Sequence, residues 1–376
     1  MKMKKIGILT HYYGSDNYGG LLQAYALCKK LNNLGYDAEQ ICFKSNQMID
    51  DEIIQKKASK GFRGLAHWIV SLLQRKITSR KLTMKNFREN FIPHSDIVYT
   101  EENIDESNEK YDLFITGSDQ VWNLNWYEHV YFLDFVKEKP RVSYAASLGM
   151  EQLSDEQKEL LNEKLKNYKA ISVREDKAVE LIKNYTDYDA EKVLDPTLLL
   201  NSDEWDEIVP ERKINKPYLF CYFLGKRNDI RKLAIEYAKN NSLKLVTIPY
   251  LLGNYRKCDL KFGDIKLFDP NPSEFISLIK YADCVMTDSF HACVFSNIYK
   301  KNYFVFQRYL SGKMSSRIYS LLDLFKCSER FCDNKEKENL QYIEKVTVES
   351  QSQKIIEEQK KSINYIRNAI DNKETL

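Results

Sequence analysis

The residues around His291 have the clearest potential for chemistry. Residues 284–286 are apolar and predict a buried strand, residues 287–289 form a polar turn, and an apolar helix begins near His291. Ligands of α/β proteins bind at the carboxyl ends of strands, because helix N-termini and loop amides converge there. An imidazole titrates near neutral pH, and the start of a helix favours an anion. We therefore predict that His291 transfers a proton beside a bound phosphate or carboxylate.

Asp119 is the second candidate. It follows the apolar residues 113–116, within the segment Gly-Ser-Asp-Gln-Val-Trp-Asn at residues 117–123. A carboxylate at a strand end can take protons from sugar hydroxyls, and Trp122 or Trp126 can stack on the face of a sugar. The alternative is a helix cap, a position that Ser and Asp often occupy. We expect Asp119 to belong to the site, with both roles open.

Arg174 ends the predicted strand at residues 171–173 and places a permanent cation at a strand terminus. Its guanidinium matches a carboxylate or phosphate with two parallel hydrogen bonds. The alternative is an ion pair with Glu175, Asp176 or Asp195.

Three further cations follow in the second half of the chain, Arg308, Lys313 and Arg317, on a predicted loop before a helix at residues 318–325. Lys313 is typical of an ordinary solvated surface lysine. Arg317 lies at the helix start, where a cation opposes the helix dipole unless an anion is close.

A glycine-containing loop follows the first predicted strand, residues 5–10. It lacks both the third glycine of a dinucleotide fingerprint and the Gly-Lys-Ser/Thr of a P-loop, so it is not a phosphate-binding motif. Asn17, Tyr18 and Gly19 nevertheless let the backbone approach a ligand closely at a strand end. The alternative is a tight turn that starts a packed helix.

Metal chemistry is not indicated. His11, His67, His94 and His129 do not lie at metal-ligand spacing from cysteines or acids, although His11 ends a strand and is a minor candidate for lining a cleft. The eight cysteines contain no Cys-x-x-Cys pair, and several lie inside apolar runs. They are typical of small buried hydrophobes in a reducing compartment.

The composition is that of an ordinary globular protein. The chain has 376 residues, which suits two domains, and it is 43% hydrophobic and 30% charged. Its formal net charge of +3 gives no general argument for binding nucleic acid, and we predict no nucleic-acid partner.

Strand and helix patterns alternate along the chain, which predicts parallel sheets. The first half combines strands at residues 5–10, 38–43, 142–146 and 170–174 with helices, and the pattern restarts after a linker near residue 195. The predicted fold is α/β, with two Rossmann-like domains that face a cleft. We place the domains at residues 1–195 and 196–345, followed by a charged helical tail at residues 346–376.

Residues 47–107 form an insert that departs from this rhythm. From residue 56 to residue 88 it has ten basic residues and no acidic one, around an apolar stretch at residues 65–73 that contains Trp68. Such a segment suits an anionic membrane surface, and the alternative is a helical hairpin packed on its own domain. The first apolar run is too short for an exported leader or a membrane span. We expect a cytoplasmic protein, with contact at the inner face of the membrane as an open possibility.

Seven of these segments, in order over nearly the whole chain, resemble the polysaccharide pyruvyl transferases. They are residues 5–10, 17–25, 117–123, 144–149, 171–175, 195–197 and 287–291. The resemblance implies a GT-B-like fold with the active site between the domains. It also implies transfer of the pyruvyl group of phosphoenolpyruvate, without a cofactor, to two hydroxyls of a sugar in a surface polysaccharide or its lipid-linked precursor. The product would be a cyclic ketal.

The family's donor-binding histidine falls on His291, and a family arginine falls on Arg174. Many members have an arginine two positions before this histidine, where this chain has Ser289. The departure implies that Arg308, Lys313 or Arg317 takes over, or that the donor differs. On the acceptor side we expect Asn17, Tyr18, Gly19 and Trp122. A nucleotide-sugar glycosyltransferase of GT-B fold and a non-catalytic component of a polysaccharide assembly complex remain the alternatives.

Overall fold

The computed structural model describes residues 3–49, 65–251, 256–309, 316–332 and 353–371, and for residues 65–74 and 316 the backbone alone. The chain divides into two compact units. Unit 1 comprises residues 1–64, 85–200 and 357–376, and unit 2 comprises residues 65–84 and 201–356. The division after Leu200 is close to the predicted linker near residue 195.

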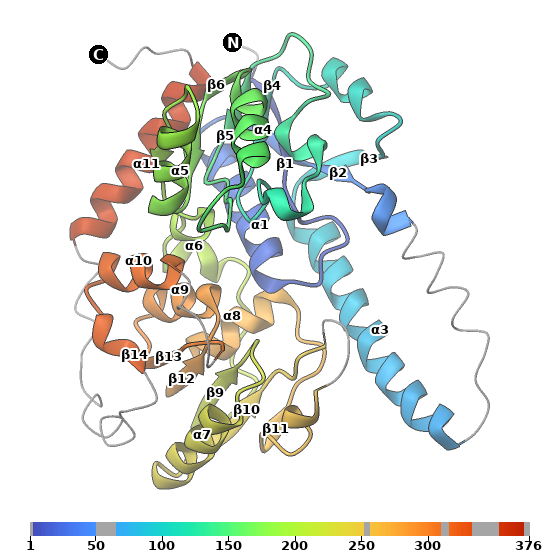
Figure 1. The fold of residues 1–376 in the computed structure, drawn as a ribbon. Coiled ribbons are helices and arrows are strands. Elements are labelled where there is room, and N and C mark those ends of the chain that lie inside the picture. Colours follow the sequence, from blue (N-terminus) through green and yellow to red (C-terminus); the bar gives the residue numbers. More distant parts are fainter. Residues whose placement is uncertain (1–2, 50–64, 252–255, 310–315, 333–352, 372–376) are drawn as a thin grey trace. The chain divides into compact units, whose positions relative to one another are not determined.

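Unit 1 is built on a six-stranded parallel sheet with the order β3-β2-β1-β4-β5-β6 (Figure 1). This is the doubly wound Rossmann order, and its chain reverses direction across the sheet between β1 and β4. A short parallel pair, β7 and β8, continues beyond it. The strands are β1 (Lys5–Leu9), β2 (Asp37–Phe43), β3 (His94–Tyr99), β4 (Leu113–Thr116), β5 (Arg141–Ser143), β6 (Tyr168–Ala170), β7 (Ser172–Val173) and β8 (Glu191–Lys192).

Local signals in the sequence explain where the helices of unit 1 begin. The side chain of Asn17 accepts a hydrogen bond from the amide of Gly19, so the first helix starts one turn earlier than its apolar pattern predicts. Ser154 and Gln157 form a capping box before the next amphipathic helix. The helices of unit 1 are α1 (Tyr18–Asn33), α4 (Asp155–Leu165) and α5 (Asp176–Tyr185), with short 3₁₀ turns η1 (Ile104–Glu109), η2 (Leu124–Trp126), η3 (His129–Phe132) and η4 (Pro196–Leu198). The helix α3 (Leu65–Phe91) is divided between the two units, and its residues from Lys85 onward belong to unit 1.

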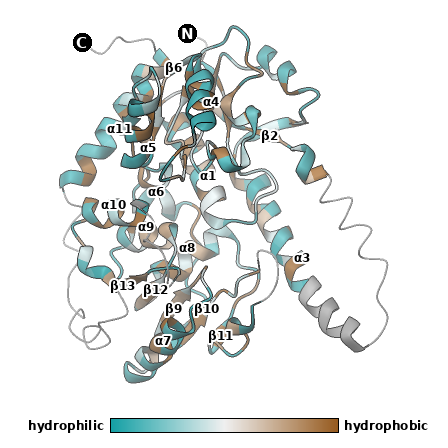
Figure 2. Ribbon diagram, in the orientation of Figure 1, coloured by the Kyte–Doolittle hydropathy of each residue, from teal (hydrophilic) through white to brown (hydrophobic). Residues whose placement is uncertain are grey.

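The C-terminal helix α11 (Gln353–Asp371) returns to unit 1, where Tyr365, Ile366 and Ile370 join a hydrophobic core with residues of β1, α1 and β4 (Figure 1). The Tyr365 hydroxyl donates to the carbonyl of Ser143 at 2.8 Å. The predicted tail is therefore a structural part of the first Rossmann-like domain. Figure 2 shows hydrophilic and hydrophobic residues alternating along this helix, as expected for one buried face.

Unit 2 repeats the same plan. Its six parallel strands have the order β11-β10-β9-β12-β13-β14, so the chain reverses between β9 and β12. All residues of β9 and β12 are buried, and Figure 2 shows these strands as mainly hydrophobic, because helices cover both faces of a parallel sheet. The strands are β9 (Tyr218–Tyr222), β10 (Lys244–Thr247), β11 (Ile265–Lys266), β12 (Cys284–Thr287), β13 (Tyr303–Phe306) and β14 (Phe331–Cys332).

The helices of unit 2 are α6 (Ser202–Asp206), α7 (Asn228–Asn240), α8 (Pro272–Lys280), α9 (Phe290–Ile298) and α10 (Ser316–Leu324), with 3₁₀ turns η5 (Lys257–Asp259) and η6 (Ser328–Arg330). Two doubly wound sheets and a C-terminal helix confirm the predicted α/β fold with two Rossmann-like domains.

The basic insert contributes the long helix α3, whose residues up to Met84 group with unit 2 and the rest with unit 1. Lys56, Lys57, Lys60 and Arg63 lie outside the described residues, as do the side chains of residues 65–73. Membrane contact by the insert therefore stays a prediction. Among the described helices, none combines the length and the apolar character that crossing a bilayer requires.

Candidate functional site

Each sheet has a topological switch point, the place where ligands of open α/β sheets bind. In unit 1 it lies at the carboxyl ends of β1 and β4, which are followed by His11 and by Asp119. In unit 2 it lies at the ends of β9 and β12, which are followed by Gly225 and by Ser289. The two strongest sequence candidates, Asp119 and His291, thus follow strands that border the switch points of their own units.

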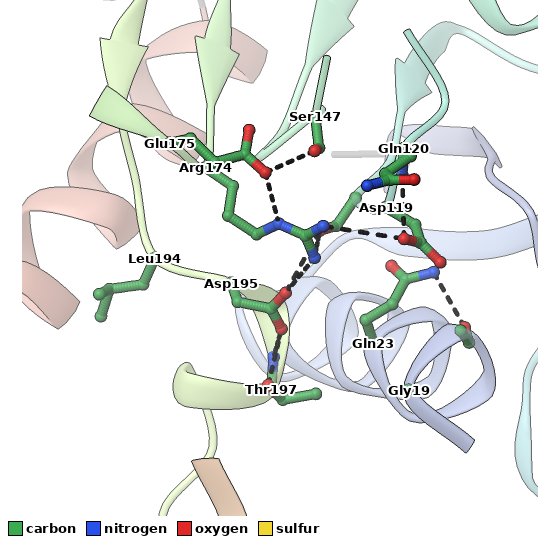
Figure 3. A network of polar contacts seen from close by, with 12 residues as sticks. Gly19, Gln23, Asp119, Gln120, Ser147, Arg174, Glu175, Leu194, Asp195 and Thr197 are labelled. Carbon is green, nitrogen blue, oxygen red and sulfur yellow. Dashed lines mark hydrogen bonds and ion pairs between the residues drawn. The ribbon is translucent and has the colours of Figure 1, made fainter. Parts of the chain in front are cut away.

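Asp119 has an unusual backbone conformation, with φ of +86° in the region that favours glycine. Its carbonyl accepts a hydrogen bond from the amide of Ser147 at 2.9 Å, and a β-bridge links it to Ala146. Oδ1 accepts from the amide of Gln120 at 2.9 Å and lies 3.7 Å from Nη2 of Arg174 (Figure 3). The side chain is 21% exposed. A strained backbone and a guanidinium therefore hold a partly accessible carboxylate at the switch point.

Arg174 is almost completely buried, with 3% of its side chain exposed. Figure 3 shows its guanidinium between three carboxylates. Nη1 lies 2.7 Å from Oδ2 of Asp195, and Nε lies 3.4 Å from Oε1 of Glu175. Burial lowers the pKa of Arg174, but the charges of Asp195, Glu175 and Asp119 outweigh this and raise the pKa above its usual range.

The ion-pair alternative for Arg174 is thus realised through Glu175 and Asp195, while Asp176 pairs with Lys192 instead. Three carboxylates surround the single guanidinium of Arg174, so the local charge is negative. A negative local charge disfavours the approach of a doubly anionic donor. This geometry supports a positioning role for Arg174 toward Asp119 over direct contact with the donor.

His11, the minor candidate for lining a cleft, is a neighbour of Asp119. Its ring meets the ring of Tyr131 edge-on at 4.2 Å between centroids. Burial lowers the pKa of His11, and the nearby charge of Asp119 partly opposes this shift. The first turn of α1 packs tightly here, because a methyl group on Gly20 would lie 3.2 Å from the His11 carbonyl oxygen and 3.7 Å from Oδ2 of Asp119.

Two acceptor-side expectations need correction. Trp122 is fully buried, stacks on Phe132 at 5.4 Å and donates through Nε1 to the carbonyl of Tyr131, so it offers no face to a sugar. Tyr18 is buried as well, because the first turn of α1 faces the core. Asn17 is exposed but its side chain caps the helix at Gly19. Trp126, by contrast, is 55% exposed and remains available for stacking.

In unit 2, Asp288 ties the ends of β9 and β12 together. Its buried carboxylate accepts hydrogen bonds from the amides of Leu224 at 2.6 Å and Gly225 at 2.7 Å. Burial raises the pKa of Asp288, while Arg308 and the two amides oppose this shift. The sequence indicates the turn but not this role, because the amides come from the segment after β9, where Leu224 lies 64 residues before Asp288.

His291 lies in the first turn of α9, as predicted, and is partly buried beside the ring of Phe290. Ser289 occupies the N-cap position, but its side chain makes no capping hydrogen bond to the helix.

Two arginines lie near this helix start. Arg308 donates from Nη2 to the carbonyl of Asp288 at 3.3 Å, and the guanidinium of Arg317 lies 5.9 Å from the ring of Phe290. The structure therefore brings both arginines to the start of α9. Lys313 lies outside the described residues.

The family model described as polysaccharide pyruvyl transferase matches residues 17–307, which include Asp119, Arg174 and His291. This chain belongs to the polysaccharide pyruvyl transferase family. It is accordingly a transferase. A comparison with curated proteins found no match.

Solved structures of similar fold cover nearly the whole of this pyruvyl transferase family member. Anabaena HepE in complex with UDP and glucose has a TM-score of 0.52 at 10% identity and covers 98% of this chain and 99% of its own. S. aureus MnaA with UDP has a TM-score of 0.51 at 15% identity, with 99% of both chains covered. A glycosyltransferase from Rickettsia africae has a TM-score of 0.51 at 12% identity, with 99% and 100% covered. These likenesses show the GT-B fold class and nothing about substrates.

Proposed function

We propose that this protein transfers the pyruvyl group of phosphoenolpyruvate to two hydroxyls of one sugar in a surface polysaccharide or its lipid-linked precursor. The products are a cyclic ketal and inorganic phosphate. Membership of the polysaccharide pyruvyl transferase family supports the reaction class. The distribution of charge over the two switch points supports the assignment of donor and acceptor roles.

The donor half of the reaction is assigned to unit 2. Phosphoenolpyruvate carries a carboxylate and a phosphate, which need cations and free amides. The side chains of Arg308 and Arg317 reach the start of α9, and the first turn of this helix contains His291. We assign to His291 the delivery of a proton to the methylene carbon of the donor. This step makes the central carbon electrophilic, with oxocarbenium character.

The acceptor half is assigned to Asp119. Its carboxylate is partly exposed at the switch point of unit 1, where it can accept a proton from a sugar hydroxyl. Arg174 holds Asp119 in position and keeps it ionised, because a nearby positive charge favours the carboxylate form. Trp126 is an exposed aromatic residue on which a sugar can stack.

The bonds and protons of this scheme balance. One hydroxyl oxygen bonds to the central carbon of the donor while the methylene carbon becomes a methyl group. The carbon–oxygen bond to phosphate then breaks, and the second hydroxyl closes the ring. Two hydroxyl protons are released in total, of which one ends on the methyl group and the other on the departing phosphate.

The observation that carries the proposal is the position of His291 in the first turn of α9. Arg308 donates a hydrogen bond to the carbonyl of Asp288, the residue before the N-cap of this helix.

A direct test incubates the protein with phosphoenolpyruvate and candidate lipid-linked oligosaccharides. We expect phosphate release together with a mass gain of one ketal-linked pyruvate. Thermal protection by UDP- or GDP-sugars but not by phosphoenolpyruvate would instead identify a glycosyltransferase. Absence of any turnover or ligand protection would leave a non-catalytic role.

The role of His291 is tested by His291→Ala. Loss of a general acid lowers kcat by about 10²–10⁴-fold, whereas binding of the donor should persist through the arginines. His129→Gln is a matched control, because His129 is exposed and lies in unit 1. Near-normal turnover of the His291→Ala variant would refute the proton-transfer role.

A further inference from the structure

Gln23 is a buried polar residue that no step of the proposed reaction uses. It lies in the second turn of α1, and its side chain is completely buried. Its Nε2 donates hydrogen bonds to the carbonyl of Gly20 at 2.9 Å and to the hydroxyl of Thr10 at 3.1 Å. Because a carbonyl can only accept, the contact with Gly20 decides which end of the amide is the nitrogen.

The oxygen of this amide shows that Gln23 is more than a packing residue. Among the described residues, none donates a hydrogen bond to Oε1, although this atom is buried. An unsatisfied buried acceptor costs free energy comparable to what hydrogen bonds contribute, and an aliphatic side chain would avoid this cost. The net stabilisation by the amide is therefore small, and stability alone does not explain a glutamine at this position.

Two hydrogen bonds lead from Gln23 to the residue before Asp119. Thr10 directly follows β1, and its buried hydroxyl accepts from Gln23 and donates to the carbonyl of Ser118. A hydroxyl has a single proton, so the direction of both bonds is fixed. The main chain of Ser118, which follows β4, is thus tied to α1 through one hydroxyl group.

The turn that contains Asp119 is strained. Its φ of +86° is a conformation that persists only where the surroundings determine it. Arg174 holds the side chains of the turn, because Nη1 donates to the hydroxyl of Ser118 at 3.3 Å and Nη2 lies 3.7 Å from Oδ1 of Asp119. Thr10 holds the main chain instead. Two separate contacts, one to side chains and one to the backbone, therefore fix this turn.

The first turn of α1 is close to the Asp119 carboxylate as well. A methyl group on Gly20 would lie only 3.7 Å from Oδ2 of Asp119. Gln23 holds this helix turn through its bond to the Gly20 carbonyl, and Figure 3 shows its side chain extending from α1 toward Asp119. Gln23 is thus linked to both segments beside the carboxylate, directly to the helix turn and through Thr10 to the turn after β4.

We propose that Gln23 is a positioning residue for the acceptor half of the reaction: through Thr10 and Gly20 it fixes the strained turn at Asp119, so that the carboxylate is aligned with a sugar hydroxyl. This inference rests on the proposed function for the role of Asp119. It also gives a role to the segment at residues 17–25, in which Tyr18 is buried and Asn17 caps the helix.

Three variants of the full-length protein test the proposal. Gln23→Leu removes the amide, Thr10→Val removes the hydroxyl and Thr10→Ser keeps it. The substrates are phosphoenolpyruvate and a lipid-linked oligosaccharide that the wild type converts. We expect Gln23→Leu and Thr10→Val to lower kcat by about 10- to 100-fold and to leave KM for phosphoenolpyruvate within about twofold, because a misplaced catalytic group slows the reaction without weakening donor binding. Thr10→Ser should keep most of the wild-type kcat.

A second readout needs no acceptor. The charge of Asp119 raises the pKa of His11, so a displaced carboxylate should lower this pKa, as measured by NMR titration of the imidazole. Neither Gln23→Leu nor Thr10→Val changes a charge itself. We expect a lower pKa of His11 in both variants and the wild-type value in Thr10→Ser.

Gln40→Leu is the matched control. Gln40 is a completely buried glutamine of β2 that donates from Nε2 to the carbonyl of Ala24 at 3.1 Å. This variant should lower the melting temperature about as much as Gln23→Leu does, but keep kcat and the pKa of His11. An equal fall of kcat in Gln40→Leu would show a general effect of losing a buried glutamine and would contradict the inference.

The two readouts separate this inference from the proposed function. If Gln23→Leu keeps the pKa of His11, Asp119 has not moved and the inference is wrong, whether or not the variant melts at a lower temperature. If this pKa falls but the wild type converts no oligosaccharide with phosphoenolpyruvate, Gln23 positions Asp119 and the proposed function is wrong.

Discussion

Arg174 and Asp195 form a buried ion pair, with 2.7 Å between Nη1 and Oδ2, although they are 21 residues apart in the sequence. The pair joins the end of β7 to the turn η4, where Asp195 also accepts hydrogen bonds from the amide and hydroxyl of Thr197. The guanidinium then reaches Asp119 from the other side. The position of Asp119, the carboxylate to which we assign the acceptor half of the reaction, thus depends on the contact between Arg174 and Asp195.

Asp195→Asn should destabilise the protein by about 3 kcal/mol, because removing one partner of a buried pair leaves the other charge poorly compensated. Glu175 and Asp119 remain near Arg174 and keep the cost from being larger. The free energy of unfolding in urea measures the effect. Asp105→Asn is the control, since its ion pair with Lys137 is exposed and contributes at most about 1 kcal/mol. Equal losses in the two variants would contradict the importance of the buried pair.

Trp122 and Trp126 should behave in opposite ways. Trp122→Ala removes a fully buried ring and should cost about 3–5 kcal/mol of stability. Trp126→Ala removes an exposed ring and should change stability by no more than about 0.5 kcal/mol. If Trp126 stacks on the acceptor sugar, its loss raises KM for the acceptor by about 2- to 10-fold. An unchanged acceptor KM would remove Trp126 from the site.

Much of the fold could be predicted because it follows from local patterns. The strand predicted at residues 5–10 is β1 at Lys5–Leu9, and the strand predicted at residues 38–43 is β2 at Asp37–Phe43. Apolar runs bounded by caps and turns determine these elements almost without tertiary information. Their alternation then implies parallel sheets.

The surroundings of the candidate residues could not be predicted in the same way. Trp122 and Trp126 differ by four positions, and only the packing of Trp122 on Phe132 decides which one is buried. Arg80 lies among basic residues of a polar helix and is buried, whereas Lys81 is exposed, and nothing local distinguishes the two. Burial of a single side chain depends on segments that are distant in the sequence, such as Phe268 and Asp269 for α3.

His11 should make the stability of unit 1 depend on pH. Its pKa is lower in the folded state than in the unfolded chain, mainly because of burial. As the pH falls through about 6.5, the unfolded state takes up a proton that the folded state does not, so stability decreases. The wild type should therefore lose more stability than His11→Asn between about pH 7.5 and pH 5.5, as measured by urea unfolding.

Asp119 provides an internal check on this pH effect. Its charge raises the pKa of His11 and so limits the shift caused by burial. Asp119→Asn should lower the pKa of His11 further and make the loss of stability at acidic pH steeper. A stability difference between the wild type and His11→Asn that is constant with pH would show that His11 titrates alike in both states.

Gly225, in the turn after β9, has little room for a side chain. A methyl group there would lie 2.5 Å from the carbonyl oxygen of Arg308 and 2.8 Å from Oδ2 of Asp288. Such distances are too short for any carbon contact, so Gly225→Ala must displace the backbone next to Arg308. We expect a stability loss of about 1–3 kcal/mol and a higher KM for phosphoenolpyruvate.

Gly35→Ala separates these two effects. Gly35 has φ of +93° but no atom within 4 Å of an added methyl group, so alanine strains the backbone without a clash. This variant should lose about 1 kcal/mol of stability and keep the KM of the wild type for phosphoenolpyruvate. If Gly225→Ala also left that KM unchanged, the turn after β9 would have no part in holding the donor. The donor contacts would then have to come from the start of α9 and from the arginines without any support from Asp288.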